Sequence, residues 1–456
     1  MRLAIALALL MLTACSKPTQ VKQTTAEVSA SDPFLDSLSH DTFMFFWEQA
    51  DKQGQVPDRW PTPSFSSIAA TGFGLTTYLV GVERGYITRE QAAERVLTTL
   101  SFFANGPKGE QKENVIGYKG FFYHFLDAGT GTRFKTVELS TIDTGLLLGG
   151  VLSCQTYFDQ DNETERRIRE LADALYRDVD WNWAMNGQST MSMGWHPEHG
   201  FIDAYWRGYN EAMLIYILGL ASPTHPIPAD SWKAWTASYQ WAKYQGQEFI
   251  NFGPLFGHQY SHLWIDFKGI QDTYTASKGI DYFENSRRAT LANRAYCINN
   301  PAGYADYSEN IWGLTACDGP ANDNKANPNI NHEGYWARGA SQYYLKDDGT
   351  IAPTAAGASI PFAPEVCVPA LKEMKRKYGK SLYQQYGFVD AFNPSFERTD
   401  GTKGWFDKDY LGLDQGPIVI QIENYKSGFV WNLMRKNPYI RDGLRKAGFT
   451  GGWLAE

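Results

Sequence analysis

The sequence lacks several patterns on which common enzyme classes depend. It contains no CxxC pair, the usual start of a cysteine zinc site. It also has no glycine-rich phosphate loop, no dinucleotide fingerprint and no GxSxG nucleophile elbow. An excess of positive charge is absent too, because 42 Lys and Arg stand against 50 Asp and Glu, for a net charge of -8. ATP hydrolysis, serine-type ester hydrolysis and nucleic-acid binding are therefore poor interpretations, and a neutral or small ligand is favoured.

Cysteine is scarce, with five in 456 residues. Beyond the N-terminal region only Cys154, Cys297, Cys317 and Cys367 remain. An oxidising compartment would allow one pair to form a disulfide, and we predict Cys297 with Cys317, which share a loop-rich stretch. Cys154 lies in an apolar helical stretch and is interpreted as a small buried hydrophobe.

The N-terminal residues MRLAIALALLMLTAC contain an apolar run shorter than the roughly 20 residues that span a bilayer. They are typical of a secretory signal peptide covering residues 1–15. The run ends in LTAC, which resembles a bacterial lipobox and predicts lipidation of Cys15, followed by a flexible tether over 16–31. We therefore expect an exported lipoprotein in the periplasm or at the outer membrane of a Gram-negative bacterium. An ordinary signal peptide with a chance cysteine is the alternative.

From residue 32 onward there is no further long apolar run, and apolar residues recur at helical spacing. The stretches are 34–50, 66–84, 88–104, 139–159, 164–178, 209–221, 229–243, 280–298, 364–378, 417–435 and 438–447. Strands are expected to be few and short, the best being a hairpin of 120–127 with 131–136. We predict one all-α domain over 32–456, an (α/α)6 toroid with long loops and a few short β-hairpins. Helix N-termini and loops would surround its central cleft.

Aromatic residues are unusually frequent, at 15% of the chain. Many Trp and Tyr residues stand beside Gly, Asn or Asp in expected loops, where core packing explains them less well than a binding role. Their flat apolar faces and polar edges suit sugar rings, although the same residues are common at any interface. The candidates for binding a neutral polysaccharide or oligosaccharide are Trp195, Tyr205, Trp206, Trp312 and Tyr425.

Three expected helix starts carry carboxylates. Glu211 follows Asn210, an expected helix cap, in YWRGYNEAM; Asp143 lies near Glu138 in ELSTID; and Asp414 stands in a loop before Pro417, which would open a helix. Each carboxylate has a structural explanation as a cap or dipole partner, worth about 0.5–2 kcal/mol.

Glu211 stands out because aromatic residues precede it. Burial among them would raise its carboxyl pKa, as a catalytic acid requires, whereas the helix N-terminus and Arg207 would lower it. Arg207 is itself expected to order a binding subsite or to pair with a carboxylate.

Two histidine pairs, His196 with His199 and His258 with His262, have spacings that would allow metal binding on a helix. Proline and glycine nearby disturb that geometry, so sugar binding or loop structure is favoured for His196 and His258. We expect no metal and no cofactor.

Nine segments together resemble the bacterial endo-β-1,2-glucanase family, a group of glucoamylase-like proteins. They are GFFYHFLD, ELSTIDTGLLLGG, MGWHPEHGF, YWRGYNEAM, GPLFGHQYSHLWIDFK, NIWGLTACDGP, DDGTIAPTAAGASIPFAPE, GFVDAFNP and GLDQGPIVIQIENYKSG. The resemblance implies an (α/α)6 toroid that hydrolyses β-1,2-glucan to sophorose-sized oligosaccharides with inversion, and it makes Glu211 the expected proton donor. Asp143, Glu138 and Asp414 remain alternative bases.

Two other interpretations stay open. Related helical domains act on other glucan linkages, and a noncatalytic surface lipoprotein would use the same aromatic residues to capture a glycan. Two carboxylates facing one another across a cleft would favour the enzyme. In either case we expect a monomer that meets the membrane only through its lipid anchor.

Overall fold

The computed structural model describes residues 29–455 except 322, 324 and 327–330. The predicted signal peptide 1–15, its lipidation site Cys15 and most of the tether 16–31 lie outside these residues. Within the described part of the chain, no helix combines the length and the apolar character needed to cross a bilayer.

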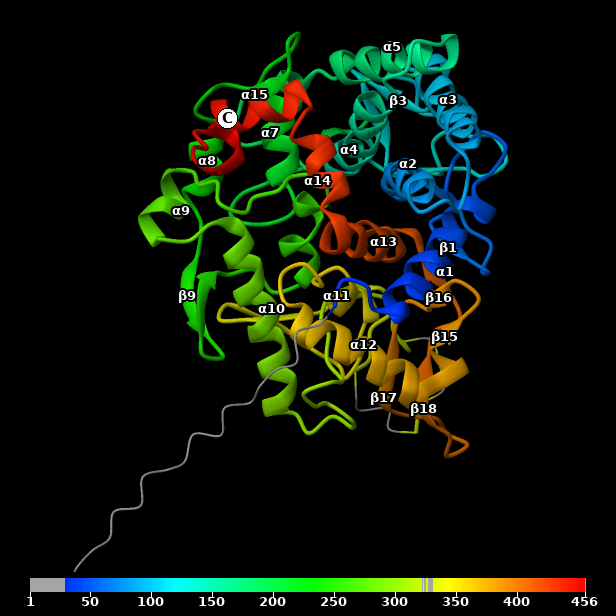
Figure 1. Ribbon diagram of the computed structural model, residues 1–456, viewed down its shortest axis with the longest axis vertical. Coiled ribbons are helices and arrows are strands. Elements are labelled where there is room, and N and C mark those ends of the chain that lie inside the picture. The colour runs from blue at the N-terminus through cyan, green and yellow to red at the C-terminus, as the bar shows by residue number, and fades with distance from the viewer. Residues whose placement is uncertain (1–28, 322, 324, 327–330, 456) are drawn as a thin grey trace, which may run out of the picture.

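Helices dominate the structure, and the predicted all-α toroid is confirmed (Figure 1). The α-helices are α1 (Pro33–Gln49), α2 (Ile68–Glu83), α3 (Arg89–Asn105), α4 (Thr141–Tyr157), α5 (Glu163–Asp178), α6 (Trp181–Ala184), α7 (Met213–Ala221), α8 (Ser231–Thr236), α9 (Thr273–Lys278), α10 (Tyr282–Asn299), α11 (Pro353–Gly357), α12 (Pro364–Tyr378), α13 (Gly412–Ser427), α14 (Phe429–Met434) and α15 (Pro438–Lys446). Amphipathic helices such as α5 and α15 cover the outside, which agrees with their charged outer residues.

The inner ring consists of six mostly or fully buried segments. Five are the helices α2, α4, α7, α11 and α13, and the sixth is formed by the consecutive 3-10 turns η1 (Leu255–His258) and η2 (Tyr260–Leu263). Neighbours are joined by direct contacts. The Leu214 N–H of α7 donates to Ser261 Oγ of η2 at 3.1 Å. Gln259 Nε2, beside η2, donates to the Ala355 carbonyl of α11 at 3.0 Å, and Thr354 Oγ1 of α11 donates to the Asp414 carbonyl of α13 at 2.9 Å.

The ring closes where α2 packs against α4 and α13. Gly72 and Gly150 make the α2–α4 contact possible, because a Cβ on Gly150 would lie 2.0 Å from the Gly72 carbonyl oxygen. A side chain at either position would force these two inner helices apart.

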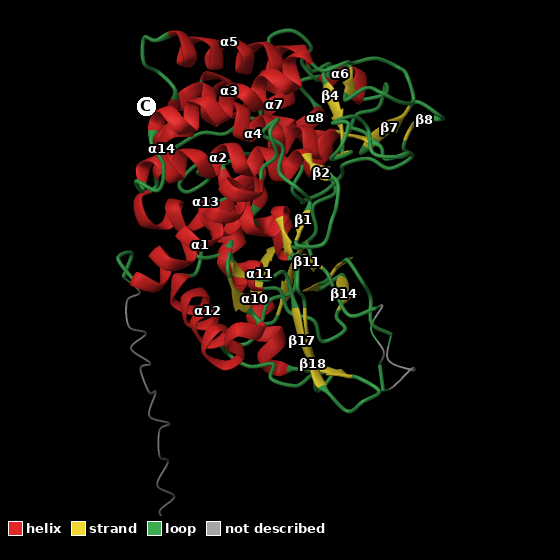
Figure 2. Ribbon diagram, turned by 90° about the vertical axis from the view of Figure 1, so that its right-hand side faces the viewer, coloured by secondary structure: helices red, strands yellow, loops and turns green. Residues whose placement is uncertain are grey.

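The strands are short and gather with the long loops on one side of the helices, as Figure 2 shows. The largest sheet has the order β3 (Gly117–Tyr118), β4 (Phe121–Tyr123), β6 (Leu139–Ser140), β7 (Gly194–His196), β8 (Gly200–Phe201). The two-stranded pairs are β1 (Arg59–Trp60) with β19 (Tyr410–Leu411), β2 (Ser66–Ser67) with β5 (Phe125–Leu126), β9 (Trp241–Tyr244) with β10 (Gln247–Ile250), β11 (Ala316–Cys317) with β12 (Trp336–Ala337), β13 (Gly339–Ser341) with β14 (Tyr344–Lys346), β15 (Tyr383–Gln384) with β16 (Gly387–Phe388), and β17 (Phe392–Glu397) with β18 (Lys403–Phe406).

The predicted hairpin of 120–127 with 131–136 is present only at its turn. Leu126 and Arg133 form an antiparallel bridge, and the Phe134 N–H donates to the Phe125 carbonyl at 3.0 Å. The first half of the segment instead pairs with β3 and β6.

The predicted helix 229–243 is wrong in its second half. Helix α8 ends at Thr236, and β9 and β10 form a hairpin through Gln245 and Gly246. Both turn residues have positive φ, 48° and 82°, as a two-residue hairpin turn of the primed type requires. The local turn thus overrides the helical spacing of the apolar residues.

The predicted Cys297–Cys317 disulfide is wrong, since all four cysteines of the described residues are free and buried. Cys297 lies in α10 inside the core, whereas Cys317 Sγ accepts a hydrogen bond from Arg338 Nη1 at 3.6 Å. Each sulfur thus has its own packing site. Cys154 is a buried hydrophobe as expected.

Two helix starts differ from the predictions. Helix α13 begins at Gly412 and contains Pro417, so Asp414 lies in its first turn and not in a preceding loop. Because Pro417 has no N–H for the Leu413 carbonyl, that oxygen accepts from Tyr260 Oη instead, at 3.3 Å. Helix α7 begins at Met213, and Asn210 accepts from the Ala212 N–H without capping the helix, which leaves Glu211 in the loop before it.

Candidate active site

A cavity of about 380 Å³ lies at the N-terminal ends of the inner segments. Its walls come from the loop before α2, the starts of α4 and α13, the residue pair before α7, and η1 and η2. The lining residues are Asp58, Arg59, Phe65, His124, Phe125, Ile142, Asp143, Leu146, Glu211, Phe256, Tyr260, Ala316, Tyr335, Leu411 and Leu413. This is the position that the toroid prediction gives for the cleft.

Glu211 lines the cavity from the loop before α7. Its Oε2 is inaccessible to solvent and has no hydrogen-bond partner among the described residues. Burial raises the pKa of the Glu211 carboxyl to about 7; its own backbone N–H opposes this shift, and the negative charge of Asp143 adds to it. Half or more of the Glu211 side chains therefore carry a proton at neutral pH and below.

His124 holds two of the predicted carboxylates together. Its Nδ1 lies 2.8 Å from Glu138 Oε1, and its Nε2 lies 3.5 Å from Asp143 Oδ1. Burial lowers the pKa of His124, but Asp143, Glu138 and Asp58 together outweigh it and raise the value to about 9. The imidazole is therefore a cation at neutral pH. It also holds the pKa of Glu138 below its usual value, against the effect of burial.

Both carboxylate oxygens of Asp143 are engaged. Oδ2 accepts a hydrogen bond from Ser140 Oγ at 2.5 Å, and Oδ1 faces His124. Ser140 also caps α4 by accepting from the Asp143 N–H at 3.2 Å, so the capping arrangement expected from the sequence is present. Asp143 is thus fixed next to Glu211 as a charged neighbour.

Asp414 approaches the cavity from the first turn of α13, behind the lining residue Leu413. It is buried, and burial raises the pKa of the Asp414 carboxyl to about 7. The Asp414 carboxyl shares a hydrogen bond with the Asp390 carboxyl, whereas Glu138 and Asp143 are both engaged with the His124 cation.

Arg59 is a lining residue that the sequence analysis missed. Its guanidinium lies 2.5 Å from Asp318 and 3.2 Å from Asp58. Asp318 directly follows β11. Since its partner Arg59 is 259 residues away in the chain, no local motif reveals the pair.

Most of the predicted sugar-binding aromatics lie away from the cavity wall. Trp312 is fully buried and Trp206 nearly so, with Trp206 Nε1 donating to Thr141 Oγ1 at 3.0 Å, so both serve the core. Trp195 packs against Tyr118 and Trp183 on the outer sheet. Tyr425 lies in the last turn of α13, at the opposite end of that helix from the cavity.

The predicted polar binders are also displaced from the cavity. His258 is buried and contacts the Phe252 carbonyl at 3.2 Å, and His196 stacks on His199 in the β7–β8 hairpin. The guanidinium of Arg207 lies over the Tyr205 ring, and its Nε donates to Thr190 Oγ1. Arg207 lines a separate, mostly polar cavity of about 310 Å³.

The aromatic residues that do line the main cavity are Phe65, Phe125, Phe256, Tyr260 and Tyr335. Phe65 and Phe125 lie with their ring centroids 4.1 Å apart, and Tyr335 is 52% exposed. Of the Phe, Tyr and Trp residues, only tryptophan and tyrosine were predicted from the sequence to bind sugar, so the phenylalanines of this apolar wall were missed.

Comparisons with known proteins agree with this architecture. A family model described as "Putative glucoamylase" matches residues 203–438. A solved structure described as a "putative glucoamylase" from Bacteroides uniformis is 34% identical, with 94% of this chain and 100% of the other covered and a TM-score of 0.81. The chain belongs to this glucoamylase-like family.

Within the family, two relatives have β-1,2-glucan activities in their names. The endo-β-1,2-glucanase of Chitinophaga pinensis, solved with sophorotriose and glucose, is 31% identical to this chain. The match covers 94% of this chain and 100% of the Chitinophaga chain, with a TM-score of 0.80. The exo β-1,2-glucooligosaccharide sophorohydrolase of Parabacteroides distasonis is 31% identical over 94% of this chain. The chain spans only 60% of the length of that curated relative. The family resemblance expected from the sequence is confirmed.

Proposed function

We propose that this glucoamylase-like protein is a glycoside hydrolase that cleaves β-1,2-glucan to short, sophorose-sized oligosaccharides with inversion at the anomeric carbon. The observation that carries the proposal is Glu211, a carboxyl group on the cavity wall whose pKa is raised by burial to about 7. A glycosidase needs such a group to protonate the leaving oxygen. The activities named for the two relatives support the choice of linkage.

In the proposed reaction, Glu211 gives its proton to the glycosidic oxygen while the bond from that oxygen to the anomeric carbon breaks. A water molecule attacks the same carbon from the opposite face and loses a proton to a carboxylate base. Inverting enzymes hold the acid and the base roughly 6.5–9.5 Å apart, with the water between them.

Asp414 is our choice for the base. It enters from α13, whereas Glu211 enters from the loop before α7, and its hydrogen-bond partner Asp390 is another carboxyl and not a cation. Asp143 and Glu138 are less suited, because both are engaged with His124. We assign Asp143 the role of a positioning residue whose negative charge helps to keep the proton on Glu211.

The cavity wall supports a neutral carbohydrate substrate. Phenylalanine and tyrosine rings present apolar faces for the C–H faces of glucose units. Arg59 and the carboxylates at its side supply donors and acceptors for sugar hydroxyls.

We also propose a cellular location for the enzyme. The lipobox-like LTAC and the polar segment 16–31 support a monomeric enzyme tethered by a lipid on Cys15 in the periplasm or at the outer membrane, with its single catalytic domain at 32–456. Metabolic labelling with a palmitate analogue tests the anchor, since Cys15→Ser should abolish the label.

The substrate assignment is tested by incubating the purified protein with linear β-1,2-glucan, laminarin or soluble starch and following reducing ends and product size. Short oligosaccharides from β-1,2-glucan alone are expected. Cleavage of another glucan would overturn the linkage, and tight binding of glucan without any product would favour a glycan-capturing protein instead.

The alkaline limb of the pH dependence follows from Glu211, whereas the acid limb follows from Asp414, whose pKa is also raised to about 7 and which must be deprotonated to act as the base. Because the folded-state pKa of Glu211 lies near 7, above its ordinary value, the active protonated form is present below pH 7 and is lost above it. We expect kcat/KM on β-1,2-glucan to fall by about tenfold per pH unit on the alkaline side of pH 7. Initial rates between pH 5 and pH 9 measure this limb. A profile that stays flat up to pH 9 would contradict the assignment of Glu211 as the acid.

A further inference from the structure

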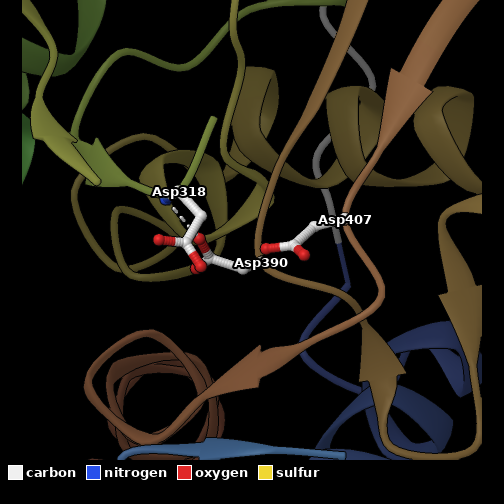
Figure 3. Close-up of side chains that lie close together, drawn as sticks. All are labelled: Asp318, Asp390 and Asp407. Carbon is white, nitrogen blue, oxygen red and sulfur yellow. Dashed lines mark hydrogen bonds between the residues drawn. The ribbon is translucent and has the colours of Figure 1, made fainter. Parts of the chain in front are cut away.

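Three carboxylates meet beside the cavity, on segments far apart in the sequence. Asp318 follows β11, Asp390 precedes β17, and Asp407 follows β18. One carboxylate oxygen from each lies within 4.8 Å of the other two (Figure 3). Asp390 and Asp407 are buried, with exposed fractions of 1% and 8%.

Asp407 is the informative member of this cluster. Its Oδ1 accepts hydrogen bonds from the Lys408 and Asp409 N–H groups at 2.7 and 3.2 Å. Its Oδ2 is inaccessible to solvent and has no hydrogen-bond partner in the described part of the chain. Figure 3 shows the Asp407 carboxylate directed toward Asp390 and Asp318. A buried carboxylate oxygen without a donor costs free energy unless a cation or a proton compensates it.

Within the described residues, the salt bridges bring one cation to the cluster, Arg59, and Asp390 also shares a side-chain hydrogen bond with the Asp414 carboxyl. Asp390 accepts the Asp318 N–H at 2.7 Å, and Arg59 pairs with Asp318 from the cavity side. Salt bridges found in the described residues include none to Asp390 or Asp407. Arg59 is therefore the cation that faces up to three negative charges of the cluster, and it also forms a salt bridge with Asp58.

We propose that Asp318, Asp390 and Asp407 bind a divalent cation of the size of Ca²⁺. The ligands are all carboxylate oxygens, which hard cations prefer over zinc or copper. Oxygens within 4.8 Å of one another can surround Ca²⁺, whose opposite ligands are about 4.6–5.2 Å apart. The flexible coordination of Ca²⁺ suits carboxylates from three separate segments better than the strict octahedral geometry of Mg²⁺.

The ion would crosslink three segments of the chain: the loop after β11, the residues before β17 and the residues after β18. Asp318 also forms a salt bridge with Arg59 of the cavity wall, so a bound ion would stabilise the position of Arg59. No metal was expected from the sequence, because its histidines and cysteines lack the spacing of a typical metal site. Aspartates from three separate segments carry no such signal.

Calcium binding is measured directly on the purified protein after EDTA treatment and dialysis, by isothermal titration calorimetry with CaCl₂. We expect about one Ca²⁺ per chain and a rise in Tm of about 3–8 °C at saturating Ca²⁺. Asp407→Asn keeps an oxygen for the two N–H groups but removes a charged ligand, and it should weaken Ca²⁺ binding by about tenfold or more. The matched control is Asp400→Asn, an exposed aspartate in the turn between β17 and β18, which should bind Ca²⁺ like the parent.

The Tm of Asp407→Asn distinguishes a calcium site from a carboxylate cluster that is neutralised by protons alone. Without an ion, Asp407→Asn relieves repulsion, so its Tm would equal or exceed that of the parent, and neither protein would respond to Ca²⁺. That outcome, Ca²⁺ binding unchanged in Asp407→Asn, or equally tight binding of Mg²⁺ would overturn the assignment. None of these readouts depends on hydrolysis, so they stand apart from the proposed function.

Discussion

Glu211→Gln is expected to lower kcat on β-1,2-glucan by about 10²–10⁴-fold, the usual contribution of a general acid. Glutamine keeps the size of the side chain but carries no acidic proton for the leaving oxygen. Substrate binding should change little, because the loss falls on the transition state. The measurement is the initial rate of reducing-end release at pH 7, close to the pKa values of both the acid Glu211 and the base Asp414.

Two comparisons separate this result from a folding defect. Glu113→Gln, at an exposed position, should keep full activity. Above pH 7, burying the charged Glu211 carboxylate lowers the free energy of unfolding of the parent, whereas below pH 4.5 the group is protonated and this cost disappears. Glu211→Gln should therefore be more stable than the parent above pH 7, by at most about 3 kcal/mol. Urea unfolding at pH 5 and pH 8 measures the difference. Full activity in the variant would return Glu211 to a structural role.

Asp414→Asn is expected to cause a comparable loss of about 10²–10⁴-fold, but with a different response to added azide. Azide attacks carbon without needing a base, so it should restore turnover of Asp414→Asn and give the α-glycosyl azide, the product of inversion. It should not rescue Glu211→Gln, whose defect lies at the leaving group. Product analysis by mass spectrometry and NMR distinguishes the two variants.

Asp143→Asn is the matched control for the base assignment. Since Asp143 acts through its charge on Glu211, its loss should lower the pKa of Glu211 and move the alkaline limb of the kcat/KM profile to lower pH. Azide should have no effect on this variant. Rescue of Asp143→Asn by azide, with none of Asp414→Asn, would exchange the two roles.

The fold follows from the sequence where one signal governs each segment. Helix α12 occupies the predicted range 364–378, because its apolar residues keep helical spacing and Pro364 opens it. The prediction fails at 229–243, where the Gln245–Gly246 turn selects a hairpin. It also fails at the Cys297–Cys317 pair, since proximity in sequence says nothing about the direction in which a thiol points.

The site is less predictable because its members meet only after folding. Glu211 and Asp143 are identifiable from their local motifs, and both line the cavity. His124 and Arg59 acquire their roles through carboxylates contributed by other segments. The burial of Trp312 and Trp206 was not predictable, because glycine and asparagine neighbours do not report whether an indole ends inside the core.

The inner ring has a consequence for how this architecture changes over time. Each of the six inner segments is buried along most of its length, but the cavity lies at their N-terminal ends. The short strands and long loops gather on one side of the helices (Figure 2). Insertions or substitutions in these loops alter the cavity without disturbing the helix contacts below it. A lineage with this ring can therefore exchange one sugar linkage for another by remodelling its loops, while the Gly72–Gly150 contact and the helices it joins stay as they are.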